Sequence, residues 1–454
     1  MRYAALAVDY DGTLATSGRV ADETVRALER VVESGRKVIL VTGRELDELI
    51  AVFPEIMIFD RVVAENGAVL YTPSTSERRT LGDPPLPEFV RELARRGVQP
   101  LSIGRSIVAT VQPHETVVLE AIRDLGLELN VVFNKGAVMI LPASMNKASG
   151  LAVALLDLGL SPRNVAAIGD AENDHAMLRF AEFGVAVGNA LPALKAEADR
   201  VSTCENGGAV RELAEDLLRD DLQATPPRRR EIMLGRRFDG DELRIPASCN
   251  VLIAGREQPG TTLATGLLKR VQESGYQFCT IGTADEYATA LPEATVISTG
   301  GRQAIADTIS ALQKPDASVI VDIDGVQGES RPAMVKDLHH ALKRMRSSTG
   351  RPHWILVEGI ERMSETESLP ETIADEYGGM IYLATDVEWI ESHVMESVDV
   401  AVALDASTHR ALTNVAGMRD SELPDDRGAA VNAGDAVVWR RDDPRQSIWM
   451  HILP

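Results

Sequence analysis

The chain has 454 residues, a formal net charge of −21, 44% hydrophobic residues and 25% charged residues. This length predicts more than one globular domain, and the acidic balance argues against a basic nucleic-acid surface or a membrane-binding face. The three cysteines lie far apart and fit neither a zinc spacing nor a disulfide framework. The sequence has no basic, apolar leader and no run of about 18 apolar residues. We therefore expect a cytoplasmic protein with no membrane or nucleic-acid partner.

The first apolar run, residues 3–8, ends abruptly in two carboxylates, Asp9 and Asp11, followed by Gly12. Residues at i and i+2 of an extended segment project to the same side, so both side chains can face one small volume. Two acids this close repel each other unless a cation or a proton lies between them. Mg²⁺ prefers oxygen ligands and would also attract phosphate. The alternative, which this motif alone leaves open, is a strand that ends in a polar turn.

The next elements predict a βαβ unit. Asp22 is the expected N-cap of a helix that turns Val25, Leu28, Val31 and Val32 inward. A buried strand over residues 37–41 then runs into Thr42, Gly43 and Arg44. Asp9 and Thr42 should therefore share the carboxyl edge of a parallel sheet, where open α/β sheets bind their ligands. Further along, Asn66-Gly67 between two apolar runs predicts a hairpin.

The pattern changes between residues 84 and 143. Prolines open this segment, and its periodicity predicts two helix–strand–strand repeats, with helices over 88–96 and 114–125 and strands over 98–103, 106–112, 127–133 and 137–141. Such an αββαββ insert inside a parallel α/β unit indicates a lid over the active edge. Lys135, in the last predicted hairpin, is a candidate substrate contact.

The parallel sheet resumes beyond Lys147. An apolar strand over residues 164–168 ends in Gly169 and Asp170, and Asn173 and Asp174 follow at the start of a helix. Residues 185–190 predict another strand, with a polar terminus at Asn189, and a later helix ends near Asp220. Carboxylates thus follow a second strand at the same predicted edge.

Taken in order, four segments resemble the motifs of the haloacid dehalogenase superfamily of phosphotransferases: Asp9-x-Asp11-Gly-Thr, Thr42-Gly-Arg, Lys147 and Gly169-Asp170-x-x-Asn173-Asp174. The αββαββ insert between the second and third motifs resembles the cap of the Cof-like branch, which includes phosphoglycolate and sucrose-phosphate phosphatases. This resemblance implies a Rossmann-like, parallel-sheet phosphatase core over residues 1–83 and 144–222, with a cap domain over residues 84–143.

The resemblance also implies residue roles. Asp9 would attack phosphorus and form an aspartyl-phosphate, and Asp11 would protonate the leaving alkoxide and later deprotonate the hydrolytic water. Thr42 and Lys147 would stabilise the phosphoryl oxygens. The candidate Mg²⁺ ligands are Asp9, Asp11, Asp170 and Asp174, although Asp174 is better suited to orienting Lys147 or water. The candidate substrate-binding residues are Gly43, Arg44, Asn66 and Asn173.

A linker over residues 223–230, which contains two prolines and three arginines, precedes a second α/β region over residues 231–454. In this region a strand over 250–254 runs into Gly255 and Gly260, which have the spacing of a phosphate-binding P-loop, Gly-x4-Gly-Lys-Ser/Thr. Thr261 occupies the lysine position, so a main source of charge stabilisation is absent. Thr262 retains the hydroxyl that coordinates magnesium.

The alternation of strands and helices in this region resembles HerA/FtsK-like P-loop ATPases. In that comparison Glu358 replaces the Walker B aspartate and Gly359 replaces the catalytic glutamate. We therefore expect a degenerate P-loop NTPase-like domain that does not hydrolyse ATP. The sequence leaves open whether Gly255, Gly260, Thr261 and Thr262 bind a nucleotide, and whether the chain forms a homo-oligomer.

These features predict a Mg²⁺-dependent phosphatase that acts on a small phosphorylated metabolite, either a sugar phosphate or a phosphoglycolate-like acid. The second region would be a regulatory pseudo-ATPase. The alternative is a nucleotide-binding regulatory or scaffold protein, in which the P-loop-like region carries the main role.

Overall fold

The computed structural model describes residues 1–227, 229–255, 257–298, 300–324, 330–363, 378–405, 408 and 434–453. Three residues of the predicted linker and second domain, Arg228, Arg256 and Pro454, are among those outside the described residues. The chain divides into two units, Tyr3–Pro227 in one and Arg228–Pro454 with Met1–Arg2 in the other. No helix in the described parts of the chain is long and apolar enough to cross a lipid bilayer.

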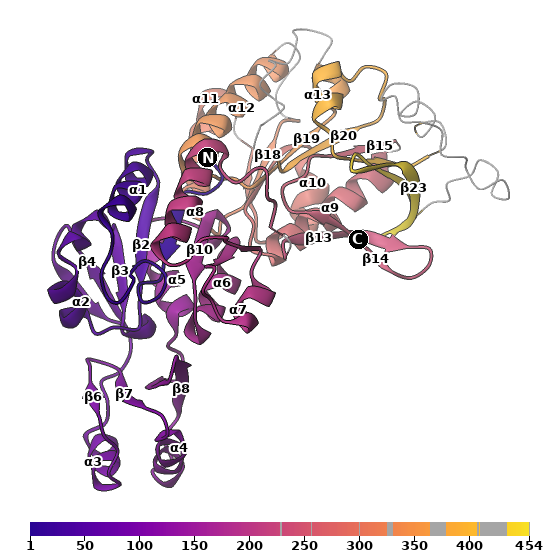
Figure 1. Cartoon of the computed structure of the whole chain (residues 1–454). Helices are drawn as coiled ribbons and strands as arrows, with labels where there is room; N and C mark the ends of the chain where they lie inside the picture. The colour runs from indigo at the N-terminus through magenta and orange to yellow at the C-terminus, as the bar shows by residue number, and fades with distance from the viewer. Residues whose placement is uncertain are drawn as a thin grey trace. The chain divides into compact units, whose positions relative to one another are not determined.

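An eight-stranded sheet forms the centre of the first unit, in the order β12-β11-β10-β1-β2-β3-β4-β5 (Figure 1). Its strands are β1 (Ala5–Val8), β2 (Lys37–Val41), β3 (Arg61–Ala64), β4 (Val69–Thr72), β5 (Glu77–Thr80), β10 (Val165–Gly169), β11 (Phe183–Ala186) and β12 (Arg200–Val201). The pairs from β12 to β3 are parallel, and β4 and β5 add antiparallel pairs at one end. The predicted parallel α/β core of the N-terminal half is therefore confirmed.

The helices of this core are α1 (Asp22–Glu33), α2 (Leu46–Val52), α5 (Lys147–Asp157), α6 (His175–Phe180), α7 (Pro192–Glu197) and α8 (Gly207–Asp220). Helix α1 differs from the prediction in two details. Ala21, rather than Asp22, holds the N-cap position. Its buried stripe is Thr24, Ala27, Leu28 and Val31, so Val32 falls beside the stripe and is 39% exposed.

The segment between β5 and α5 forms its own four-stranded antiparallel sheet, in the order β6-β7-β9-β8. Its elements are α3 (Pro87–Arg95), β6 (Ser102–Ile103), β7 (Val108–Val111), α4 (Glu115–Asp124), β8 (Leu129–Asn134) and β9 (Ala137–Pro142). Strand β6 is much shorter than the expected strand over 98–103, because Pro100 cannot donate a ladder hydrogen bond.

The two faces of the cap sheet pack against different parts of the unit. Val108 and Ile140 lie in a cluster with Phe89 of α3 and Val118 of α4. In Figure 1 these two helices lie at the end of the cap farthest from the core sheet. Three other apolar residues of the cap, Ile107, Met139 and Leu141, cluster with Ala68 of the core. The cap sheet is thus bound to the core on one side and to its own helices on the other.

The second unit contains an eleven-stranded sheet in the order β14-β13-β23-β22-β21-β15-β20-β19-β16-β18-β17. The strands from β21 to β17 pair in parallel, and the other four add antiparallel pairs. The eleven strands of this sheet are β13 (Glu231–Arg237), β14 (Glu242–Pro246), β15 (Val251–Ala254), β16 (Phe278–Gly282), β17 (Thr295–Ile297), β18 (Val319–Asp322), β19 (Trp354–Glu358), β20 (Met380–Ala384), β21 (Val400–Ala403), β22 (Asp435–Arg440) and β23 (Asp443–Ile452). The described helices are α9 (Glu257–Glu273), α10 (Ala284–Ala290), α11 (Gly301–Leu312), α12 (Ser330–Thr349) and α13 (Ser392–Ser397).

The predicted phosphate loop of this second unit is largely helical. Strand β15 ends at Ala254 and α9 begins at Glu257, so Gly260, Thr261 and Thr262 lie within the helix. Pro259 is tolerated there because the N–H groups of a first helical turn have no intrahelical acceptor. The Thr262 hydroxyl donates to the Gln258 carbonyl at 3.0 Å. Most of the predicted loop is therefore helical, and a P-loop domain is not confirmed.

Candidate active site

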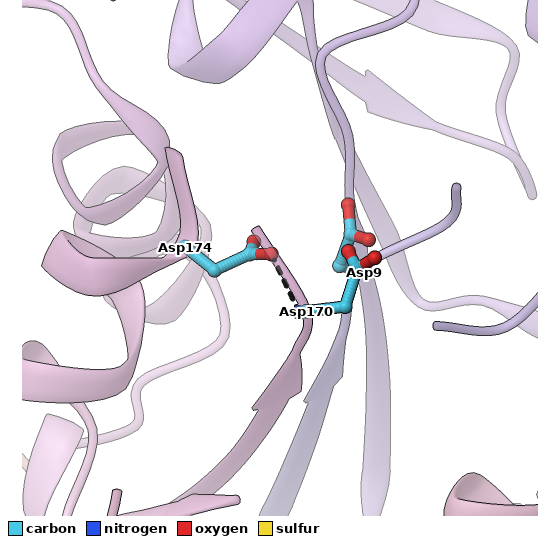
Figure 2. Close-up of side chains that lie close together, drawn as sticks. All are labelled: Asp9, Asp170 and Asp174. Carbon is cyan, nitrogen blue, oxygen red and sulfur yellow. Dashed lines mark hydrogen bonds between the residues drawn. The ribbon is translucent and has the colours of Figure 1, made fainter. Parts of the chain in front are cut away.

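Three loops leave the first sheet side by side at its carboxyl edge. Val8 of β1 is in register with Ile168 of β10 and with Leu40 of β2. Asp9, Asp170 and Thr42 therefore follow neighbouring strand ends, because the strands are parallel. Figure 2 shows the carboxylates of Asp9, Asp170 and Asp174 gathered at this edge. One oxygen of each lies within 4.8 Å of the other two, and the three residues are 4%, 1% and 0% exposed.

Lys147 neutralises part of this buried charge. Its Nζ donates to Asp9 Oδ1 and to Asp174 Oδ1, both at 2.6 Å, and the residue is 1% exposed. Lys147 is the first residue of α5, whose start is fixed by a capping box: the Asn146 side chain accepts from Ser149 N, and the Ser149 hydroxyl accepts from Asn146 N. The cap of α5 therefore sets the point from which Lys147 reaches the carboxylates.

Asp174 has a hydrogen-bond donor from the chain on each oxygen. Its Oδ2 accepts from the backbone N–H groups of Asp170 and Ala171 at 2.9 and 3.0 Å, and its Oδ1 accepts from Lys147. Gly169 permits this close approach, since a Cβ there would overlap the Asp174 carboxylate. Asp174 is thus arranged to hold Lys147 and the end of β10. Asp170 accepts from Thr13 Oγ1 on Oδ1, at 3.4 Å, and from Lys135 Nζ on Oδ2.

Burial shifts the pKa values of these groups. It raises the pKa of Asp9 well above its ordinary value, with a further rise from Asp174 that Lys147 opposes. Burial also raises the pKa of Asp170, against a hydrogen bond from Lys135. Burial lowers the pKa of Lys147, but attraction to Asp174 and Asp9 outweighs it, and the pKa lies above its ordinary value. Lys147 alone does not balance three buried carboxylates, and an all-oxygen donor set of this charge fits Mg²⁺.

The Asp11 carboxylate points to Arg44 and does not belong to the cluster of Asp9, Asp170 and Asp174. Arg44 donates from Nε to Asp11 Oδ2 at 2.6 Å and from Nη2 to Asp11 Oδ1 at 2.8 Å, and from Nη1 to Glu48 at 2.5 Å. The hydrogen bonds with Asp11 raise the pKa of Arg44. The Asp11 side chain is 41% exposed. In this structure Arg44 therefore binds two carboxylates, where the sequence predicted a contact with substrate.

The remaining predicted residues line the adjoining wall. The Thr42 hydroxyl accepts from Arg44 N at 3.1 Å, and a Cβ on Gly43 would lie 3.5 Å from Asn173 Nδ2. Asn173 Nδ2 donates to Asn66 Oδ1 at 3.1 Å. The other half of each amide, Asn66 Nδ2 and Asn173 Oδ1, is buried without a hydrogen-bond partner in the described structure. Unsatisfied buried polar groups are rare, so this donor and acceptor are candidates for contact with a ligand.

The cap contributes a cation to the same site. Lys135 and Gly136, with φ of 46° and 90°, form the two-residue turn between β8 and β9. Lys135 N donates to Glu172 Oε2 at 3.2 Å, and Lys135 Nζ donates to Asp170 Oδ2. Gly12, with φ of 82°, makes room, since a Cβ there would overlap both Asp170 and the ammonium of Lys135.

Two further residues of this site are not among the candidate site residues named from the sequence. Glu172 binds the cap turn, and the Asn189 side chain donates to the Gly12 carbonyl at 2.9 Å. Asn189 carries a usable signal, because it follows β11 at the same carboxyl edge of the sheet. The only sequence signal for Glu172 is its position between Asp170 and Asn173.

In the second unit, the predicted phosphate-binding residues occupy two successive elements. Gly255 follows β15, while Gly260, Thr261 and Thr262 lie along α9. Glu358, at the end of β19, accepts from Thr283 N at 2.7 Å.

Comparisons with known proteins concern the first unit. The family described as haloacid dehalogenase-like hydrolase matches residues 6–95 and 107–213. A phosphoglycolate phosphatase of Methanothermobacter thermautotrophicus is 38% identical over 217 residues, which cover 46% of this chain and 96% of the relative. A phosphoglycolate phosphatase of Archaeoglobus fulgidus is 34% identical over 209 residues, or 45% of this chain and 93% of the relative. The crystal structure of a haloacid dehalogenase-like hydrolase from Bacteroides thetaiotaomicron aligns with a TM-score of 0.43 and 22% identity, covering 47% of this chain and 99% of that one.

Proposed function

This chain belongs to the haloacid dehalogenase-like hydrolases and is a phosphoric monoester hydrolase, and we propose that it releases phosphate from a small phosphorylated metabolite with Mg²⁺ as cofactor. The observation that carries this proposal is the buried cluster of Asp9, Asp170 and Asp174, held together by Lys147. The relatives are named for phosphoglycolate, which makes phosphoglycolate the first substrate to test, with sugar phosphates next.

Asp9 is the nucleophile in this proposal. One carboxylate oxygen attacks phosphorus, the ester P–O bond breaks on the opposite side, and an aspartyl-phosphate forms. Lys147 lowers the cost of bringing a phosphate dianion to a buried carboxylate, because its ammonium is already 2.6 Å from Asp9. The Thr42 hydroxyl offers a further donor to the phosphoryl oxygens. Mg²⁺, held by Asp9 and Asp170, would neutralise charge on the phosphoryl oxygens when bound.

Asp11 is the acid and base of the proposal. It gives a proton to the leaving alkoxide and later takes one from the water that attacks the aspartyl-phosphate. In this structure both oxygens of the Asp11 carboxylate accept hydrogen bonds from Arg44. Proton donation therefore requires that Asp11 leave Arg44 and accept a proton before the ester bond breaks.

The test is phosphate release by the purified full-length protein from phosphoglycolate, from a sugar phosphate and from p-nitrophenyl phosphate, each with Mg²⁺ and with a chelator. We expect turnover with Mg²⁺ on at least one metabolite and its loss with the chelator. No Mg²⁺-dependent phosphate release from any of them would contradict the proposal.

The second candidate function, nucleotide binding by the second unit, has weaker support. The helical start of α9 removes the loop that the sequence predicted, and Thr261 still replaces the lysine. Calorimetry with ATP and Mg²⁺ tests this alternative directly. Saturable binding would favour a regulatory role for the second unit.

A further inference from the structure

The hairpin turn at Lys135 places a flexible cation inside the proposed active site. The turn is held to the core through the backbone, since Lys135 N donates to Glu172. Its ammonium donates to Asp170 and lies where a Cβ on Gly12 would be. The Lys135 side chain is 46% exposed, whereas Asp170 is 1% exposed. Lys135 is therefore a half-exposed cation that enters the site from the cap.

The contact with Asp170 competes with the proposed cofactor. Asp9 and Asp170 are the proposed Mg²⁺ ligands, but Lys135 donates to Asp170 Oδ2 and Thr13 donates to Asp170 Oδ1. An ammonium and a divalent cation do not share one short contact with the same oxygen, because they repel each other. With Mg²⁺ at Asp170, the ammonium of Lys135 would be available to pair with another anion close to the turn.

The substrate provides that anion. Two core residues, Lys147 and Thr42, can donate hydrogen bonds to the phosphoryl group, and Mg²⁺ held by Asp9 and Asp170 would add positive charge there. In-line displacement puts the leaving group on the side of phosphorus away from Asp9. The leaving group is thus the part of the substrate that a cap residue can contact without displacing a core donor.

We propose that Lys135 is a specificity-determining residue that selects phosphomonoesters whose leaving group carries a second negative charge, such as a carboxylate. This inference rests on the proposed phosphatase function and narrows its substrate class from small phosphorylated metabolites to phosphorylated organic acids. The ammonium forms a charge-assisted hydrogen bond with the carboxylate, an interaction that Mg²⁺ at Asp170 makes available.

The experiment compares phosphoglycolate with its neutral methyl ester, which has the same phosphoester bond but no carboxylate. We expect the wild-type protein to prefer phosphoglycolate and Lys135→Gln to lose about 10-fold to 100-fold in kcat/KM on phosphoglycolate. On the methyl ester the change should stay within about threefold, and Lys135→Arg should recover part of the loss. Arg123→Gln is the matched control, since Arg123 is a 73% exposed cap cation that pairs with Asp124.

Binding supplies a readout independent of turnover. Calorimetry measures phosphoglycolate binding to Asp9→Asn and to Asp9→Asn/Lys135→Gln, both with Mg²⁺. The double variant should bind phosphoglycolate more weakly than Asp9→Asn by a factor similar to the loss in kcat/KM. Circular dichroism checks that both variants are folded. Equal losses on the two substrates, or no loss and unchanged binding, would overturn the role of Lys135 while leaving the phosphatase function intact. If the wild-type protein hydrolyses neither substrate and does not hydrolyse p-nitrophenyl phosphate either, the phosphatase proposal is refuted and the inference with it.

Discussion

The four carboxylates at the proposed active site are divided among three cationic partners. Asp11 binds Arg44, Asp170 binds Lys135, and Asp9 shares Lys147 with Asp174. Because the side chains are chemically equivalent, their partners and burial decide what each can do. Asp9 and Asp174 are buried around Lys147, which suits a nucleophile and a residue that positions its lysine. The Asp11 side chain, paired with Arg44, is partly exposed, which suits proton exchange with water.

The raised pKa of Asp9 predicts a conflict between stability and function. When a carboxyl group has a folded-state pKa above its unfolded value of 3.8, the folded protein becomes less stable as the pH rises from the unfolded to the folded pKa. Without Mg²⁺ at pH 7, Asp9→Asn should therefore unfold at higher denaturant concentration than the wild type, by about 0.5–2 kcal/mol. The difference should vanish below the ordinary carboxyl pKa. Urea unfolding at pH 7 and pH 3, each without metal, measures it, and a less stable Asp9→Asn at pH 7 would contradict it.

At the scale of elements, the site depends on strand ends that align in register. The spacing of apolar runs is sufficient to predict β1, β2 and β10 and the polar residues that follow them, because parallel strands place their carboxyl ends together. The order of helices and strands in the cap is also predictable from periodicity. The direction of the Asp11 side chain is not, because it depends on Arg44, which lies 33 residues away.

Three other details depend on tertiary contacts that periodicity does not encode. Val32 lies beside the buried stripe of α1. Strand β6 has two residues. Helix α9 begins at Glu257, although the glycine spacing favours a loop. In the last case the prediction followed the glycine motif and did not consider that Pro259 is compatible with a first helical turn.

The turn after β1 predicts a matched pair of glycine variants. Gly12 and Gly35 have φ of 82° and 88°, but only Gly12 faces other atoms, those of Asp170 and Lys135, while nothing lies within 4 Å of a Cβ on Gly35. Both alanine substitutions should cost about 1 kcal/mol or more in unfolding free energy because of the positive φ. Only Gly12→Ala should also lose at least about tenfold in kcat/KM, because Asp170 has to move. Steady-state kinetics with urea unfolding separates the two effects, and equal activity of the variants would contradict this account.

At the scale of the whole molecule, the cysteines report on the two units separately. Cys204, in the first unit, is exposed, whereas Cys249 and Cys279, in the second, are buried. Burial raises the pKa of Cys279 to about 12 and also raises that of Cys249, so neither provides thiolate at neutral pH.

We therefore expect one fast-reacting thiol in the native protein and three in denaturant, measured with a chromogenic disulfide reagent. Cys204→Ser should remove the fast phase and leave the other two thiols unchanged. Fast reaction of more than one thiol in the native protein would show that the second unit opens readily.

The most direct test of the central claim is the turnover of Asp9→Asn. The variant keeps the size of the side chain and one oxygen that can accept from Lys147, but it removes the nucleophilic carboxylate. With Mg²⁺ and phosphoglycolate, or whichever ester the wild type hydrolyses, we expect the rate to fall by at least about 1,000-fold, while Asp47→Asn, at an exposed ion pair with Arg78, stays close to wild type. A folded Asp9→Asn protein that retains full turnover would contradict the assignment of this edge of the sheet as the active site.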